Sequence, residues 1–165
     1  MTFFKCLGNT ASYWTDRNMR FVLLDRIVSL ESGRSIHAVK TMPADEELFL
    51  DHFPGFPVVP GVLLVEMMAQ AAGKCLNTED VDRGLAMLGK INLATFRDWV
   101  RPGQLIDVFA EVVSSRPKFA TAKCHITVEQ QPRATAELLF GFLPRSHFAS
   151  DYRDPVLEEF LNRIA

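Results

Sequence analysis

The stretch His52-Phe-Pro-Gly-Phe-Pro-Val-Val-Pro-Gly61 decides how this chain folds. Its ten residues include three prolines and two glycines, a density that neither a helix nor a central strand can accommodate. We therefore predict an irregular loop of fixed shape. Pro60 is well placed at the start of a helix, because its missing N–H would have no partner in the first helical turn.

A buried helix is predicted immediately after this loop, over residues 61–76. The segment is rich in Leu, Met, Ala and Glu, which favour helices, and no further glycine occurs until Gly73. It is apolar on nearly every face, so we expect protein to cover it on most sides. Glu66 and Gln70 are four residues apart and therefore form one polar stripe on this helix.

The loop and the helix together carry groups suited to proton transfer. His52 precedes Glu66 by 14 positions, and a carboxyl inside an apolar helix is costly unless it is paired or neutralised. The N–H groups of Gly61 and Val62 lie at the helix start, where backbone donors lack partners and can stabilise a thioester oxygen that gains negative charge. A base, an acid and such donors are the groups that β-elimination of water requires.

The rest of the chain is predicted to form strands and a C-terminal helix. Period-2 or β-rich patterns indicate strands at residues 20–30, 34–42, 84–100, 105–114, 119–129 and 134–143. Pro102-Gly103 predicts a type II turn, and residues 130–132 a hairpin connection. Asp154 and Pro155 open an amphipathic helix. The sum is an α+β protein in which one curved antiparallel sheet wraps around a hydrophobic helix.

Composition limits the classes of function. The formal net charge of -2 speaks against the basic field that nucleic-acid binding requires. A length of 165 residues favours a single domain over 1–165, and the longest apolar stretch, residues 56–69, is too short and too broken to insert into a membrane. The three cysteines, Cys6, Cys75 and Cys124, lack CxxC spacing, so we expect reduced thiols, no metal site and a cytoplasmic protein.

The segment from His52 to Gly73 resembles the signature of the FabZ/FabA-type 3-hydroxyacyl-[acyl-carrier-protein] dehydratases of fatty-acid synthesis. Glu66, in place of an aspartate, points to the FabZ branch. The resemblance extends over about residues 20–143 and leaves residues 144–165 as a C-terminal helical extension. It implies a hot-dog fold, in which the curved sheet wraps around the central helix, and dehydration of a 3-hydroxyacyl thioester to the trans-2-enoyl thioester.

The resemblance also implies roles for individual residues. His52 would act as the base, the N–H of Gly61, beside that of Val62, would polarise the thioester carbonyl, and Glu66 would handle the leaving hydroxyl. Gln70 would support the site, although a purely structural hydrogen bond explains it equally well. The resemblance implies no metal and no organic cofactor. It implies a substrate that is linked to phosphopantetheine and enters an apolar tunnel. We expect the tunnel entrance at three residues: Phe53, Phe56 and Pro60.

The resemblance implies a homodimer with its two active sites at the interface, His52 of one protomer facing Glu66 of the other, and it allows a trimer of dimers. Acyl carrier protein, or coenzyme A, would supply the thioester. Phe56 departs from the family pattern, in which this position is usually polar or basic. Five basic residues could form a basic face for an acidic carrier protein or belong to an ordinary solvated strand face: Arg97, Arg101, Arg116, Lys118 and Lys123.

Two other functions stay open. The chain could be another hot-dog thioester enzyme, either an acyl-CoA hydratase or a thioesterase, but a thioesterase does not need His52 in this loop. It could also be a non-catalytic hot-dog subunit that pairs with an active partner. The presence of both His52 and Glu66 argues against the subunit, whereas Phe56 could block the entrance.

Overall fold

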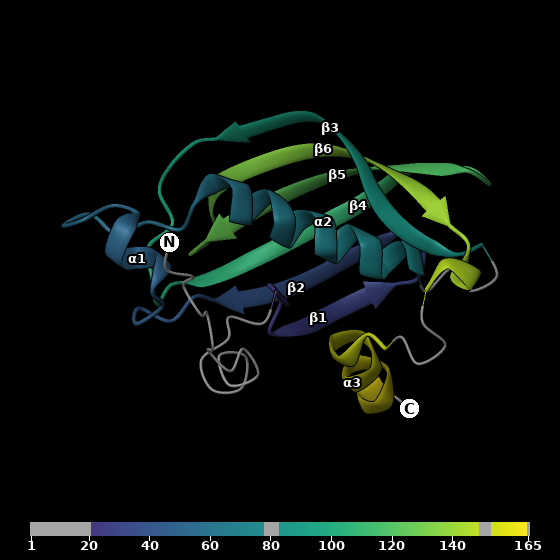
Figure 1. Cartoon of the computed structure of the whole chain (residues 1–165), viewed down its shortest axis with the longest axis horizontal. Coiled ribbons are helices and arrows are strands. Elements are labelled where there is room, and N and C mark those ends of the chain that lie inside the picture. Colours follow the sequence, from purple (N-terminus) through teal and green to yellow (C-terminus); the bar gives the residue numbers. More distant parts are fainter. Residues whose placement is uncertain (1–20, 78–82, 149–152, 165) are drawn as a thin grey trace, which may run out of the picture.

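The computed structural model describes residues 21–77, 83–148 and 153–164. An antiparallel six-stranded sheet curves around one long helix, α2 (Figure 1). The strands are β1 (Arg26–Glu31), β2 (Ser35–Thr41), β3 (Leu85–Phe96), β4 (Leu105–Ser115), β5 (Phe119–Val128) and β6 (Gln131–Leu143). The helices are α1 (Leu48–Asp51), α2 (Gly61–Asn77), a 3-10 turn at Arg145–His147, and α3 (Pro155–Ile164). The strand order is β1-β2-β4-β5-β6-β3, so β3 forms one edge of the sheet.

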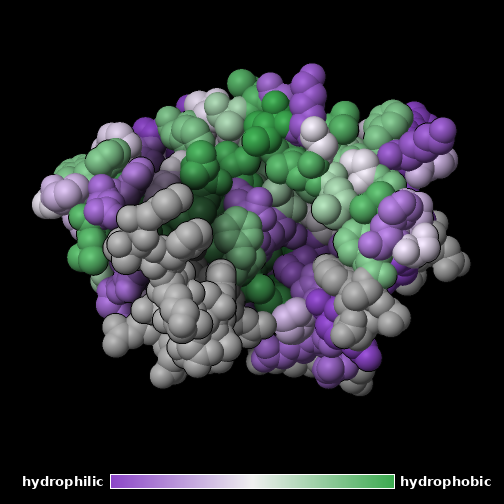
Figure 2. Space-filling model, in the orientation of Figure 1, coloured by the Kyte–Doolittle hydropathy of each residue, from purple (hydrophilic) through white to green (hydrophobic). Residues whose placement is uncertain are grey.

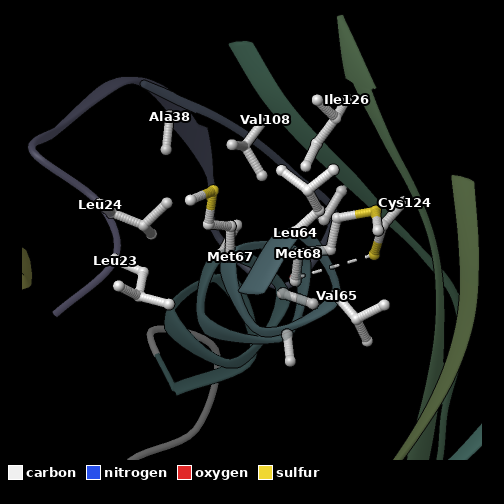
Figure 3. Packing of buried hydrophobic residues seen from close by; sticks show 14 of the residues in the cluster. Leu23, Leu24, Ala38, Leu64, Val65, Met67, Met68, Val108, Cys124 and Ile126 are labelled. Atoms are coloured by element: carbon white, nitrogen blue, oxygen red, sulfur yellow. Dashed lines mark hydrogen bonds between the residues drawn. The ribbon is translucent and has the colours of Figure 1, made fainter. Parts of the chain in front are cut away.

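Period-2 alternation places the core between the sheet and α2. Alternate residues of the central strands are buried, and many of them are alanines, which leave room for the helix to approach the sheet. Figure 3 shows this packing around α2, with Leu23 and Leu24 on one side and Cys124 and Ile126 on the other. Met67 and Met68 of α2 are fully buried, and such burial stabilises the fold by about 1.5–3 kcal/mol for each side chain.

The predicted central helix is confirmed, and it starts where the loop sequence indicated. The Pro60 carbonyl accepts hydrogen bonds from the N–H groups of Leu63 and Leu64, at 2.9 and 3.3 Å. As predicted, most of the helix is enclosed: 11 of its 17 residues are buried, including all six from Ala71 to Leu76. Exposure is confined to positions nearer its start. Val62, for example, is 74% exposed.

The turns agree with the sequence in one place and differ in another. Gly103 has a φ of 80°, and the N–H of Gln104 donates to the Arg101 carbonyl at 3.3 Å, as a type II turn requires. The β5–β6 hairpin turns at Glu129 and Gln130, both with positive φ, and therefore lies earlier than predicted. Neither residue is the asparagine or glycine that usually marks such a turn.

The first strand begins later than the sequence pattern predicted, at Arg26. Leu23 and Leu24 are not strand residues: the N–H of Leu23 donates to the Gln70 side chain, and both side chains pack into the core beside α2. At the other end of the chain, the predicted cap is confirmed: the N–H of Leu157 donates to Asp154 Oδ1 at 3.1 Å, and Pro155 is the first residue of α3. Among the described helices, none is long and apolar enough to cross a membrane.

Candidate active site

His52 lies in the loop between α1 and α2, and its ring is held from two sides. Its Nδ1 atom is 3.2 Å from the Val58 carbonyl oxygen, and its ring stacks on Phe53 with centroids 4.2 Å apart. The N–H of Val59 bonds to the carbonyl of Val100 at 2.8 Å, which ties the loop to the body of the protein. Because Nδ1 faces an acceptor, the neutral ring carries its proton there and leaves Nε2 free to accept one.

Glu66 and Gln70 lie one turn apart on the side of α2 that the sheet leaves uncovered. Gln70 Nε2 donates to Glu66 Oε1 at 3.0 Å and to the Phe21 carbonyl at 3.0 Å. The N–H of Leu23 donates to Gln70 Oε1 at 2.8 Å. Gln70 thus has structural hydrogen bonds to the segment before β1 and also contacts the Glu66 carboxyl group. Its role in the site stays a prediction.

A cavity of about 480 Å³ opens beside this polar pair. It runs along α2 from Glu66 to Asn77, with Ala86, Met87 and Leu88 of β3 on its other side. Figure 2 shows hydrophilic side chains gathered in a hollow of the same face, bordered by hydrophobic side chains toward β3. The site therefore combines a carboxylate with an apolar wall, as a binding site for an acyl group needs.

The start of α2 provides open backbone donors. Within the described residues, neither the N–H of Gly61 nor that of Val62 has a hydrogen-bond acceptor in the fold. Gly61 packs against Phe96 so closely that a Cβ atom there would lie 3.0 Å from two ring carbons. A side chain at position 61 would therefore force the Phe96 ring or the start of the helix to shift.

Among the described residues, His52 does not line the cavity that contains Glu66. It lies before the N-terminus of α2, whereas Glu66 is the sixth residue of the helix. In the described part of the chain, no further strand pairs with the outer edge of β3. Five large apolar residues of β3 are between 38% and 54% exposed: Met87, Leu88, Ile91, Leu93 and Phe96.

An aromatic cluster lies at the predicted entrance. Phe56 contacts Trp99 edge to face, with ring centroids 6.0 Å apart, and the Arg101 guanidinium lies 3.7 Å above the Phe56 ring. The sequence interpretation missed Trp99, which no local motif marks. Of the five basic residues named above, Arg101 and Arg116 lie at opposite ends of β4, before its first residue and after its last.

A second group of titratable residues lies on the outer face of the sheet, away from α2. Phe109 stacks between His37 and His125, with centroids 4.2 and 4.6 Å away, and His37 Nε2 is 2.7 Å from Asp107 Oδ1. Burial, and secondly the charge of His37, lower the pKa of His125. Within the described part of the chain, no three His, Cys, Asp or Glu side chains are grouped to hold a metal ion.

Comparisons with known proteins identify a family for most of this chain. The FabA-like domain family matches residues 16–137. A 3-hydroxyacyl-[acyl-carrier-protein] dehydratase FabZ from Levilactobacillus brevis is 40% identical over 120 residues, covering 72% of this chain and 81% of that protein. The protein of the same name from Listeria welshimeri is 37% identical over 122 residues, covering 73% and 85%.

Solved structures show the same fold at low sequence identity. The dehydratase heterocomplex ApeI:P from Xenorhabdus doucetiae aligns with a TM-score of 0.61 and 19% identity, covering 88% of this chain and 93% of that one. The PaaI protein of E. coli aligns with a TM-score of 0.59 and 16% identity, covering 71% and 78%. The sheet wrapped around α2 is thus a hot-dog fold. With the His52 loop and the Glu66 helix in the matched region, the chain belongs to the FabA-like domain family.

Proposed function

We propose that this protein dehydrates a 3-hydroxyacyl thioester to the trans-2-enoyl thioester in fatty-acid or related lipid synthesis. The observation that carries the proposal is the Glu66–Gln70 pair, which borders a partly apolar cavity on α2 of a chain 40% identical to a FabZ dehydratase. Acyl carrier protein is the expected carrier, with coenzyme A as the alternative. The reaction proceeds in the cytoplasm without a metal or organic cofactor.

The chemistry follows from the groups that the loop and the helix supply. Nε2 of His52 takes the proton from the carbon alpha to the thioester carbonyl, and the N–H groups of Gly61 and Val62 hold the oxygen that gains negative charge. Glu66 in its acid form gives a proton to the 3-hydroxyl, which leaves as water. One C–H bond and one C–O bond break, one C=C bond forms, and His52 returns its proton to Glu66 through solvent.

The site is completed by a second copy of the chain. Support for a homodimer comes from β3, a twelve-residue edge strand with exposed apolar side chains, because such an edge tends to pair with another strand. His52 of one protomer then faces Glu66 of its partner, and the Phe53, Phe56 and Pro60 segment borders the entrance. A trimer of dimers is compatible with the same pairing.

The test is turnover of a 3-hydroxyacyl thioester, followed by the absorbance of the enoyl product and by a thiol reagent. We expect enoyl formation, with each proton-transfer group contributing about 10²–10⁴ in rate, so that His52→Ala and Glu66→Gln each lose most of it. Release of free thiol without enoyl product would identify a thioesterase instead. Absence of turnover with every carrier would leave the non-catalytic subunit as the explanation.

Mixing the two inactive variants tests the shared site. When His52→Ala and Glu66→Gln chains are exchanged at equal amounts, about half of the dimers are mixed, and each mixed dimer has one site with both native groups. We expect about one quarter of the wild-type rate to return. If His52 and Glu66 of the same chain formed each site, no activity would return.

A further inference from the structure

The start of α3 lines the end of the cavity that lies away from Glu66. Arg153, Asp154 and Pro155 line this cavity together with Lys74 and Asn77 of α2. The family match ends at residue 137, so this wall comes from a segment beyond the matched region. In Figure 1, α3 lies near the C-terminal end of α2, below β1.

A buried ion pair fixes this wall in place. Lys74 is 7% exposed, and its Nζ atom is 2.5 and 2.6 Å from the two carboxylate oxygens of Asp154. The same carboxylate caps α3 through the N–H of Leu157. Breaking such a pair leaves an uncompensated buried charge, so the pair holds the beginning of α3 against α2.

The distance along α2 between Glu66 and this pair limits the length of an acyl chain. Lys74 follows Glu66 by eight residues, which corresponds to about 12 Å along the helix axis. Contact between a terminal methyl and the ion pair takes up about 4 Å of this length. The remaining distance holds about six carbons beyond the hydroxyl-bearing carbon, since each C–C bond advances an extended chain by roughly 1.3 Å.

We infer that the Lys74–Asp154 pair ends the acyl-binding channel, so that the enzyme accepts 3-hydroxyacyl groups of up to about nine carbons and discriminates against longer ones. This rests on the proposed function and names its substrate class. A longer chain would have to displace a desolvated ion pair or leave its end unburied. Each methylene that stays unburied forfeits roughly fourfold in affinity.

The experiment compares kcat/KM for carrier-linked 3-hydroxybutyryl, 3-hydroxyoctanoyl and 3-hydroxytetradecanoyl thioesters. In the wild-type protein we expect the octanoyl value to exceed the butyryl value, because its further methylenes are buried in the channel. The tetradecanoyl value should lie about tenfold or more below the octanoyl value, because the longer chain must displace the ion pair. The double variant Lys74→Met with Asp154→Asn removes both charges and keeps a capping side chain at position 154. We expect it to raise the tetradecanoyl-to-octanoyl ratio by about tenfold.

Two further variants guard against indirect effects. Lys123→Met with Glu137→Gln removes an exposed ion pair on the outer face of the sheet, 3.6 Å between charged atoms, and is expected to leave the ratio unchanged. Gly73→Leu adds a side chain to the channel wall just before Lys74 without touching the ion pair. It is expected to lower the octanoyl-to-butyryl ratio.

A wild-type profile with equal values for all three chain lengths would overturn the inference and leave the dehydratase function intact. An unchanged tetradecanoyl-to-octanoyl ratio in a folded Lys74 and Asp154 double variant would also overturn it. If no thioester is dehydrated, the proposed function fails, and the channel assignment fails with it. A double variant that does not fold leaves the wild-type profile and Gly73→Leu as the deciding measurements.

Discussion

Replacing Gly61 by alanine probes both the packing and the chemistry at the start of α2. The added Cβ would lie 3.0 Å from two carbons of the Phe96 ring and 3.3 Å from a third. Ordinary carbon contacts lie at about 3.5–4.0 Å, so the ring or the helix start must move by roughly 0.5 Å. Overpacking of this kind costs about 1–3 kcal/mol, whereas alanine gains up to about 1 kcal/mol over glycine in a helix.

The net expectation for Gly61→Ala is a loss of about 0–2 kcal/mol in the free energy of unfolding, measured by urea denaturation. Gly73→Ala is the matched control for stability, because the nearest atom to its new Cβ is the Ala86 carbonyl oxygen at 3.8 Å. Without a clash, this variant should gain about 0.5–1 kcal/mol. The two variants should therefore differ by about 1–3 kcal/mol on the same helix.

The same displacement moves the backbone donors proposed to hold the thioester oxygen. Loss of one such donor costs about 10²–10³ in kcat, so a shift of the donors should lower kcat by about tenfold or more. Gly61→Ala combined with Phe96→Leu should recover part of both losses, since the clashing ring is removed. The reasoning is refuted if Gly61→Ala has wild-type kcat and is stabilised as much as Gly73→Ala.

Three other changes test separate parts of the structure. Ile91→Asp in the middle of β3 should convert the proposed dimer to a monomer in light scattering and abolish turnover; an active monomer would contradict the shared site. Burial raises the pKa of Cys124 to about 12, so this thiol should resist alkylation in the native protein and react only after unfolding, as read by mass spectrometry. Burial lowers the pKa of His125 from 6.5. Just below about pH 6.5 the unfolded chain therefore binds a proton that the native protein does not, and the free energy of unfolding decreases as the pH is lowered. His125→Phe should make the free energy of unfolding, measured by urea denaturation, depend less on pH in this range. An unchanged pH dependence would contradict this role of His125.

The local elements followed from short-range features of the sequence. Proline density defined the loop, the propensities of residues after Gly61 defined the helix, and Asp154 with Pro155 defined the last helix. These predictions succeeded because capping, proline geometry and side-chain periodicity act within a few residues. Predictions failed where tertiary contacts dominated, as at Leu23 and Leu24, which pack against α2 and do not extend β1.

The residues of the candidate site also differ in whether the sequence alone could identify them. The sequence alone marked His52, Glu66 and the amides after Pro60, because each belongs to one continuous segment with a strong motif. Only the tertiary structure showed that Gln70 also binds the segment before β1, that Trp99 joins Phe56, and that Lys74 pairs with Asp154, 80 residues away. Such contacts depend on how the sheet curves and where the chain returns, and no local pattern of residues encodes these distances.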